Sequence, residues 1–325
     1  MSQSLQTLAE SLLTGKRRAL AKAITLVESS RTEDTARAQE LLNIILPQTG
    51  KARRIGITGV PGVGKSTFIE AFGLMLIEQG LKVAVLAIDP SSERTGGSIL
   101  GDKTRMLELS RSEAAFIRPS PAGKTLGGVA RRTRETMLLC EAAGFDVVLV
   151  ETVGVGQSET AVAAMVDFFL VLALAGAGDE LQGMKRGIME LADAIAINKA
   201  EEPYLQAAER AAQQIRNALH FSAPKYDDWQ VPVLLCSALT QSGLAEIWTM
   251  IQQFASERPE RIRGLRRSQS VRWMQETVSD GLRRLVEKNE ELRALRKDLE
   301  QQVFAEELPP TLAAMRFLEA FERRT

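Results

Sequence analysis

The sequence has very little histidine and cysteine, two residue types that often bind metals or take part in catalysis. It has one histidine, His220, and two cysteines, Cys140 and Cys236, in 325 residues. A single imidazole leaves almost no basis for His-ligated metals or for Ser-His and Cys-His catalysis. The cysteines lack metal-ligand spacing, so we expect buried thiols in a reducing compartment. His220 is expected at the end of a surface helix.

Charge and hydropathy argue against two further classes. Lys plus Arg and Asp plus Glu number 41 each, so no excess charge indicates nucleic acid or an anionic membrane as a partner. No apolar run approaches the ~20 residues of a membrane span, and the first residues lack the pattern of a secretory signal. Apolar residues make up 45% and charged residues 25%, as in ordinary globular proteins. We therefore expect an ordinary soluble globular protein.

A complete phosphate-binding loop is present. Residues 59–66 read Gly-Val-Pro-Gly-Val-Gly-Lys-Ser, between an expected strand at 54–58 and an expected helix at 65–79. In this position backbone N–H groups and the helix N-terminus bind phosphate. Lys65 would reach the β- and γ-phosphates, and Ser66 would bind Mg²⁺. The other residues expected to contact the nucleotide here are Gly59, Pro61, Gly62, Val63, Gly64 and Thr67.

A second motif indicates which base is bound. An expected strand at 193–198 ends in Asn198-Lys199-Ala200-Glu201. A carboxylate at the fourth position accepts hydrogen bonds from the ring N–H and exocyclic amine of guanine, and adenine lacks this pair of donors. Glu201 stands where guanine-nucleotide proteins carry Asp, which keeps the charge and adds one methylene. The loop expected behind the base is Ser237, Ala238 and Leu239.

Acidic residues at strand ends form the expected metal side of the site. Glu151 ends a strand at 145–151 and is followed by Thr-Val-Gly154. Glu151 is expected to hold Mg²⁺ through water, and the N–H of Gly154 to sense the γ-phosphate. Gln157, in the glycine-containing segment 154–159 that is expected to be mobile, is a candidate for orienting the attacking water. Asp89 and Asp102 are further candidates on the Mg²⁺ side, so the expected ligand is Mg²⁺ with GTP or GDP.

The order of apolar segments predicts an α/β fold with a doubly wound, mainly parallel sheet. A crossover helix precedes the Glu151 strand, so we expect parallel neighbours there, as in the dimerising class of P-loop GTPases. The expected strands are 54–58, 82–88, 115–118, 145–151, 167–174, 193–198 and 231–236. The expected helices are 65–79, 127–143, 180–191, 203–219 and 243–255.

Helical segments are expected on both sides of this domain at 51–258. Residues 1–50 form an N-terminal extension, helical from residue 5 to a break at 29–32 and again to about residue 45. Residues 259–325 form a helical tail, either a hairpin packed on the core or a dimerisation arm. The basic run 258–272 is expected to be a solvated face, with a phosphate-binding patch as the alternative.

Several blocks together resemble one family, the bacterial GTPases that chaperone adenosylcobalamin-dependent methylmalonyl-CoA mutase. That family also carries an older label, the ATPase of a lysine/arginine/ornithine transport system. The blocks are Gly59–Thr67, Ala87–Ser92, Gly101–Met106, Glu151–Glu159, Ala175–Gly187 and Asn198–Glu201. The resemblance covers nearly the whole chain, and the Glu151 and 176–187 blocks are its most specific parts.

The resemblance implies a cytoplasmic homodimer that hydrolyses GTP slowly alone and faster with its mutase, and so gates loading or protection of the cofactor. It also implies that Asp179, Gln182 and Lys185 form a switch that responds to nucleotide when the mutase is bound. The family more often has Asp at position 201, where this chain has Glu. Two alternatives stay open: an ATP-dependent regulator or kinase of basic amino-acid transport, and a scaffold with negligible turnover.

Overall fold

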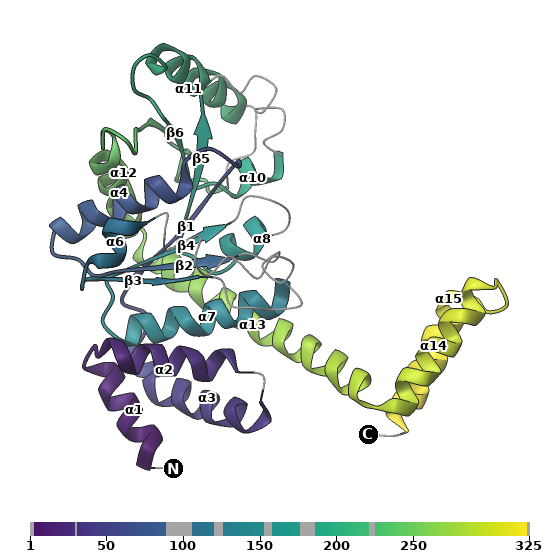
Figure 1. Ribbon diagram of the computed structural model, residues 1–325. Helices are drawn as coiled ribbons and strands as arrows, with labels where there is room; N and C mark the ends of the chain where they lie inside the picture. The colour runs from purple at the N-terminus through teal and green to yellow at the C-terminus, as the bar shows by residue number, and fades with distance from the viewer. Residues whose placement is uncertain are drawn as a thin grey trace. The chain divides into compact units, whose positions relative to one another are not determined.

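The centre of the protein is a parallel sheet, shown in Figure 1. The computed structural model describes residues 3–29, 31–88, 106–119, 126–152, 158–175, 186–220 and 225–323. The sheet has seven strands in the order β3-β2-β4-β1-β5-β6-β7. In chain order they are β1 (Arg53–Gly59), β2 (Val83–Ile88), β3 (Ala115–Arg118), β4 (Val147–Thr152), β5 (Phe168–Leu174), β6 (Ala194–Asn198) and β7 (Val233–Leu235).

Every neighbouring pair in this sheet is parallel, which confirms the predicted fold class. The seven expected strands are all present, and their ends agree with the prediction to within two residues. β4 lies between β1 and β2, and Glu151 is in register with Ile57 and Ala87. The carboxyl ends of β1 and β4 therefore meet at one edge of the sheet, where ligands bind in open α/β folds.

Both faces of the sheet are buried, which explains the continuous apolar strands. In β4, Val147 and Leu149 belong to one core, while Val148 and Val150 belong to the other. The first core is covered by α4 (Lys65–Glu78), α6 (Leu107–Arg111) and α12 (Leu244–Glu257). The second is covered by α7 (Leu126–Ala142), α8 (Ser158–Ala163), α10 (Arg186–Leu191) and α11 (Leu205–His220). His220 is exposed at the end of α11, as predicted.

The N-terminal extension packs on α7 and consists of α1 (Gln3–Leu13), α2 (Arg17–Glu28), α3 (Thr32–Ile45) and a single 3₁₀ turn, Leu46–Gln48. The expectation of one helix from residue 5 to residue 29 was wrong. The chain breaks between α1 and α2 at Gly15, whose φ of 74° lies in the left-handed region that favours glycine. The break lets Leu5 and Leu12 of α1 and Leu20 of α2 reach one core.

The chain divides into two compact units, residues 1–269 and 270–325. Three helices make up the C-terminal part: α13 (Pro259–Lys288), which runs across the division, α14 (Glu290–Phe304) and α15 (Pro310–Glu322). Within the second unit, α14 packs on α15 around Leu299 and Ala313. None of the helices in the described ranges is both long and apolar enough to cross a bilayer.

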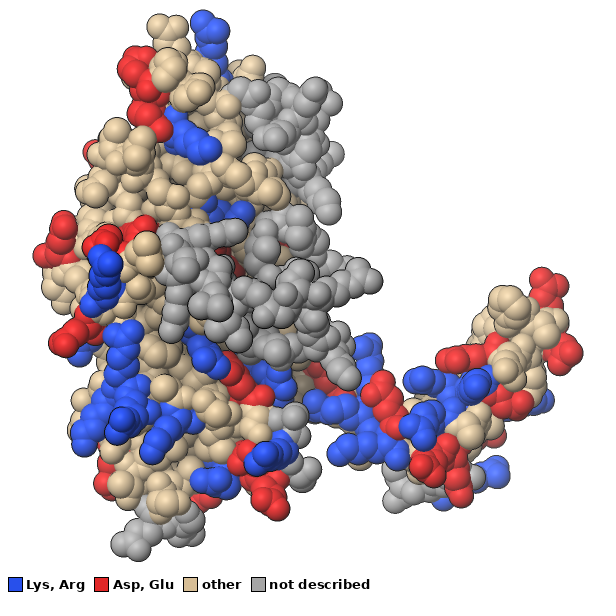
Figure 2. All heavy atoms as spheres, in the orientation of Figure 1, with Lys and Arg blue, Asp and Glu red and all other residues tan. Residues whose placement is uncertain are grey.

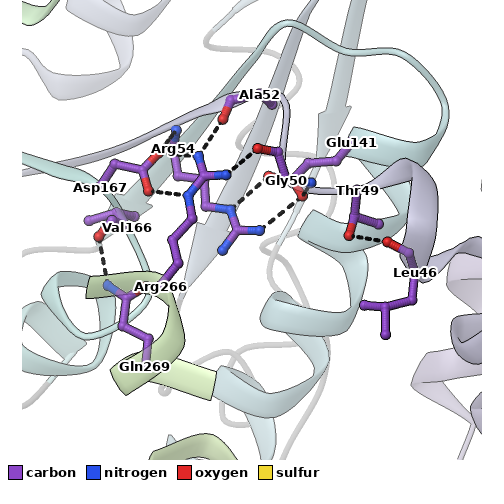
Figure 3. A network of polar contacts seen from close by, with 10 residues as sticks. All are labelled: Leu46, Thr49, Gly50, Ala52, Arg54, Glu141, Val166, Asp167, Arg266 and Gln269. Atoms are coloured by element: carbon purple, nitrogen blue, oxygen red, sulfur yellow. Dashed lines mark hydrogen bonds and ion pairs between the residues drawn. The ribbon is translucent and has the colours of Figure 1, made fainter. Parts of the chain in front are cut away.

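A polar network joins three parts of the first unit at the amino ends of β1 and β5 (Figure 3). Arg266 of α13 forms a two-pronged ion pair with Asp167, with Nε–Oδ1 and Nη2–Oδ2 distances of 2.7 and 2.6 Å. It also donates to the carbonyl oxygens of Gly50 and Ala52. Arg54 pairs with Glu141 of α7, which accepts from the N–H of Gly50.

The same network corrects one expectation. The basic run 258–272 was expected to be solvated throughout, which is wrong at two positions. The Arg266 side chain is only 18% exposed in its pair with Asp167. The guanidinium of Arg258 lies 4.7 Å from the centre of the Trp229 ring. A charge that is paired or stacked in this way is indistinguishable from a solvated one in the sequence pattern.

Candidate nucleotide site

The phosphate loop connects the end of β1 to the start of α4, as predicted. Gly64 precedes the helix with φ of 90°, and a Cβ there would lie 2.9 Å from Asn198 Nδ2. Glycine is therefore required for conformation and for space. Val63 is fully buried, whereas Pro61, Gly62 and Thr67 are exposed around the loop. Backbone N–H groups at the first turn of α4 remain available for phosphate oxygens.

Lys65 lies folded over this loop. Its Nζ donates to the carbonyl oxygens of Gly59 at 2.8 Å and Val60 at 3.3 Å, and the residue is only 9% exposed. Burial lowers the Lys65 pKa, while the carboxylates of Glu151 and Glu159 act to raise it. A buried ammonium group needs such partners to stay charged. The same group can exchange carbonyl oxygens for phosphate oxygens when a triphosphate binds.

A hydroxyl and a carboxylate meet beside Lys65. Ser66 Oγ donates to Glu151 Oε1 at 3.2 Å, and Glu151 is 7% exposed at the end of β4. A 2.7 Å hydrogen bond from Thr152 Oγ1 to Thr58 Oγ1 ties β4 to β1 next to this pair. Oxygen ligands of this kind suit Mg²⁺, which keeps several waters and takes the rest of its shell from phosphates. In the part of the chain that the structure describes, no three His, Cys, Asp or Glu residues form a metal site alone.

Asn198 joins the phosphate loop to the loop after β7. Its Nδ2 donates to the Val63 carbonyl oxygen at 2.8 Å, and its Oδ1 accepts from the Ala238 N–H at 3.1 Å. Asn198 is 1% exposed, so these bonds are shielded from water. Lys199 Nζ donates to the Gly62 carbonyl oxygen at 3.0 Å. The two residues therefore set the distance between the phosphate loop and the predicted base pocket.

Glu201 has a carboxylate oxygen without a hydrogen-bond partner among the described residues, on the predicted base side of the site. This oxygen, Oε2, is buried. The pKa of the Cys236 thiol is raised to about 12, mainly by burial and in addition by the nearby charge of Glu201. Ser237 Oγ accepts a hydrogen bond of 3.0 Å from the N–H of Thr240. Leu239 in the same loop is 77% exposed. A buried carboxylate oxygen without a partner is costly, so a ligand with two N–H donors would stabilise it.

Comparison with known proteins decides the family. A family model described as methylmalonyl Co-A mutase-associated GTPase MeaB matches residues 20–291. The chain belongs to the MeaB family. It is 54% identical over 279 residues to GTPase ArgK of Escherichia coli, covering 84% of each protein. It is 43% identical over 325 residues to the mitochondrial methylmalonic aciduria type A homolog of Mus musculus, covering 96% of this chain and 78% of the mouse protein.

A solved structure is similar over the whole chain. The crystal structure of a protein named LAO/AO transport system kinase is 41% identical, with a TM-score of 0.80, and the match covers 99% of both chains. MeaB proteins are described as GTPases, so this chain is a P-loop GTPase that binds guanine nucleotide and hydrolyses GTP. The sequence-based resemblance and the predicted enzyme class are confirmed.

The structure of this MeaB-family protein brings two predicted groups together. Lys65, Ser66 and Glu151 meet on the phosphate side, and Asn198 meets Ala238 on the base side. Other predicted residues lie outside the described ranges: Asp89, Asp102, Gly154, Gln157, Asp179, Gln182 and Lys185. The expectation of a mobile segment through residue 159 was wrong at its end, because Ser158 and Glu159 begin helix α8 and are buried.

Sequence reasoning missed Glu159 as part of the MeaB-family site. The residue is 4% exposed, its charge acts on Lys65, and its Oε2 has no partner among the described residues. The signal in the sequence was an acidic residue in the first turn of a helix shortly after Glu151. Gly154 and Gly156, which precede it, favour a loop in the sequence pattern and hide the start of this helix. Asn198 was predicted as a base-reading residue, and its bond to Val63 was not foreseen.

Proposed function

We propose that this GTPase binds an adenosylcobalamin-dependent methylmalonyl-CoA mutase and uses GTP hydrolysis to gate loading or protection of the mutase cofactor. The family match over residues 20–291 carries this proposal, since its description names a mutase-associated GTPase. The mouse relative, named for methylmalonic aciduria, supports the same partner. The proposed nucleotide site lies at one edge of the sheet, where hydrolysis can change loops that a partner contacts.

Guanine selectivity is proposed to come from Glu201. Its buried, unpartnered oxygen is suited to the ring N–H and exocyclic amine of guanine. With adenine at the same place the carboxylate would stay unpaired, and such a loss discriminates strongly between ligands. Asn198 and Lys199 hold the surrounding loops, and the Ser237–Leu239 segment lies behind the base in this proposal.

Hydrolysis is proposed to require Mg²⁺ bound with GTP. Ser66 would bind the ion directly and Glu151 through water, consistent with their 3.2 Å contact. The ion would neutralise charge that develops on the phosphates. Lys65 would move from the Gly59 and Val60 carbonyls to the β- and γ-phosphates. Further proposed roles are Mg²⁺ binding for Asp89 and Asp102, γ-phosphate sensing for Gly154, water orientation for Gln157 and partner-dependent switching for Lys185.

A homodimer formed through residues 259–325 is proposed as the assembly. The support is an apolar stripe along α13, where side chains at helical spacing are exposed. Its members are Val271, Met274, Val278, Leu282 and Leu285, each about half exposed or more. A helix that leaves such a stripe in water is stabilised by a partner that covers it. We also propose a cytoplasmic location, which the two buried free thiols support.

The alternative function is ATP-dependent regulation, or phosphorylation, in basic amino-acid transport. Its support is the transport-system name of the solved relative and the name of the Escherichia coli relative. The base side of the site argues against it, because Glu201 offers an acceptor that adenine does not satisfy. The two functions also differ in partner, so one experiment separates them.

The experiment is affinity capture from the native cytoplasm with tagged protein. The protein is loaded either with a non-hydrolysable GTP analogue or with the matching ATP analogue. We expect methylmalonyl-CoA mutase to be captured only with the GTP analogue, and Lys65→Ala to capture less of it. Capture of a transport component with the ATP analogue, and no mutase with either, would overturn the proposal.

A further inference from the structure

A groove of about 930 Å³ lies in the N-terminal extension, away from the nucleotide motifs. Its walls come from α1, α2 and the start of α3, and Arg118 closes one side from the end of β3. None of its lining residues belongs to the phosphate loop, to the Glu151 strand or to the base motif. Small-molecule sites are typically clefts of about this volume. We call it the N-terminal basic groove.

Positive charge dominates this groove. Figure 2 shows Lys and Arg gathered over the N-terminal helices in the lower part of the view. Two acids line the groove, and both are engaged: Glu28 pairs with Arg118, and Asp34 pairs with Arg37. The remaining cations have no ion pair with an acid in the described ranges. They are Lys16, Arg18, Lys22 and Arg31.

Neighbouring cations without counter-charges repel one another, so a bound polyanion would relieve that repulsion. Arg binds phosphate with paired N–H groups, and the Ser11 hydroxyl in the wall adds a donor suited to a phosphate oxygen. The Thr25 and Ser29 hydroxyls also line the wall, but they donate to the Ala21 carbonyl oxygen and to Asp34. Leu8, Ala19 and Leu26 add an apolar strip that can contact an organic ring or chain.

We propose that the N-terminal basic groove binds a small molecule that carries a pyrophosphate, of the size of a nucleotide or of coenzyme A. The concave shape and the mixture of hydroxyls, cations and an apolar strip favour such a ligand over a flat acidic protein surface. Binding there is independent of the phosphate loop, so the protein would have two anion sites in residues 1–269. The free nucleotide pool and the coenzyme A pool are the two sources of this chemistry.

The test uses full-length protein saturated with GDP and Mg²⁺, so that the phosphate loop is filled. Inorganic pyrophosphate, ATP and coenzyme A are then titrated separately by calorimetry at low and high salt. We expect at least one of them to bind once per chain and to bind more weakly at high salt. If ATP binds more tightly than pyrophosphate, the source is the nucleotide pool, and if coenzyme A does, the source is the coenzyme A pool. Either result supports the proposal.

Charge reversal provides the matched comparison. Lys22→Glu, in the groove, should weaken binding of the same probe by about tenfold or more. Arg210→Glu, an equally exposed change on α11, should leave it unchanged. GDP affinity and the melting temperature show whether both variants are folded, since neither position contacts the nucleotide motifs.

Three results would overturn the proposal. The first is no binding of any of the three probes to the GDP-saturated protein, which would leave an acidic protein surface as the better partner. The second is equal binding by Lys22→Glu and Arg210→Glu. The third is release of GDP as a probe is added, because that signal would belong to the nucleotide site.

Discussion

The amide of Asn198 donates a 2.8 Å hydrogen bond to the carbonyl oxygen of Val63, in the middle of the phosphate loop. The same side chain accepts from Ala238, so one buried residue at the end of β6 holds loops from both ends of the site. A shift of the phosphate loop would therefore move the proposed base pocket, and a shift of the loop after β7 would move the phosphate loop. In the proposed site, nucleotide selectivity and phosphate binding would therefore be coupled through Asn198.

Asn198→Ala should weaken GTP and GDP binding together, because it leaves the Val63 oxygen and the Ala238 N–H unpaired. Each buried group left without a partner costs about 1–3 kcal/mol. Calorimetry and thermal unfolding measure the two effects. Asn198→Asp is a second variant, which keeps an acceptor for Ala238 but turns a carboxylate oxygen toward the Val63 carbonyl, so it should also weaken binding. Unchanged affinity and stability in both variants would show that the link has no role.

Glu201→Ala should reduce selectivity for guanine while leaving the phosphate contacts in place. The variant removes the buried acceptor, so GTP affinity should fall by about tenfold or more and approach that for ATP. Titration with GTP, GDP, ATP and ADP is the measurement. Glu201→Asp restores the carboxylate and should retain the preference. Equal affinities for GTP and ATP in the wild type would refute the assignment of the base site.

Lys65→Ala should abolish hydrolysis and weaken triphosphate binding. Loss of one charge-assisted phosphate contact costs roughly 1.5–3 kcal/mol, a tenfold to hundredfold change in affinity. Ser66→Ala should instead raise the Mg²⁺ concentration needed for half-maximal turnover, since it removes a proposed ligand of the ion. Turnover is measured across a Mg²⁺ series. A Lys65→Ala variant with normal turnover would place catalysis elsewhere.

Arg266→Ala should destabilise the first unit by about 3 kcal/mol, because it leaves Asp167 buried without its cation (Figure 3). Arg263→Ala is the matched control on the same helix. Its pair with Glu260 is exposed, and such pairs contribute about 1 kcal/mol or less. Chemical unfolding of both variants gives the comparison. Equal losses of stability would mean that the network does not anchor α13.

Local pattern was sufficient for the sheet and for the meeting of Lys65, Ser66 and Glu151 at its edge. Apolar runs such as Val147–Val150 predicted buried parallel strands, and strand-end motifs placed Lys65, Glu151 and Asn198 at one edge. Contacts between distant segments could not be predicted. The pairing of Arg266 with Asp167 and the burial of Glu159 both depend on tertiary packing, which no local spacing encodes.

Lys185→Ala should retain slow hydrolysis by the free protein and lose most of the stimulation by methylmalonyl-CoA mutase. The expectation comes from the family-specific segment 176–187, which lies outside the described residues. Phosphoryl transfer depends mainly on positioning and on charge stabilisation. A mutase that orders this segment would therefore accelerate hydrolysis, and a variant without the Lys185 charge would respond less.

The most direct test of the proposed function is the rate of GTP hydrolysis by the wild type with and without methylmalonyl-CoA mutase, with ATP as the control nucleotide. We predict slow turnover of GTP by the free protein, clear acceleration when the mutase is added, and little turnover of ATP in either case. A rate that the mutase leaves unchanged, or hydrolysis of ATP as fast as that of GTP, would contradict a GTPase that the mutase controls.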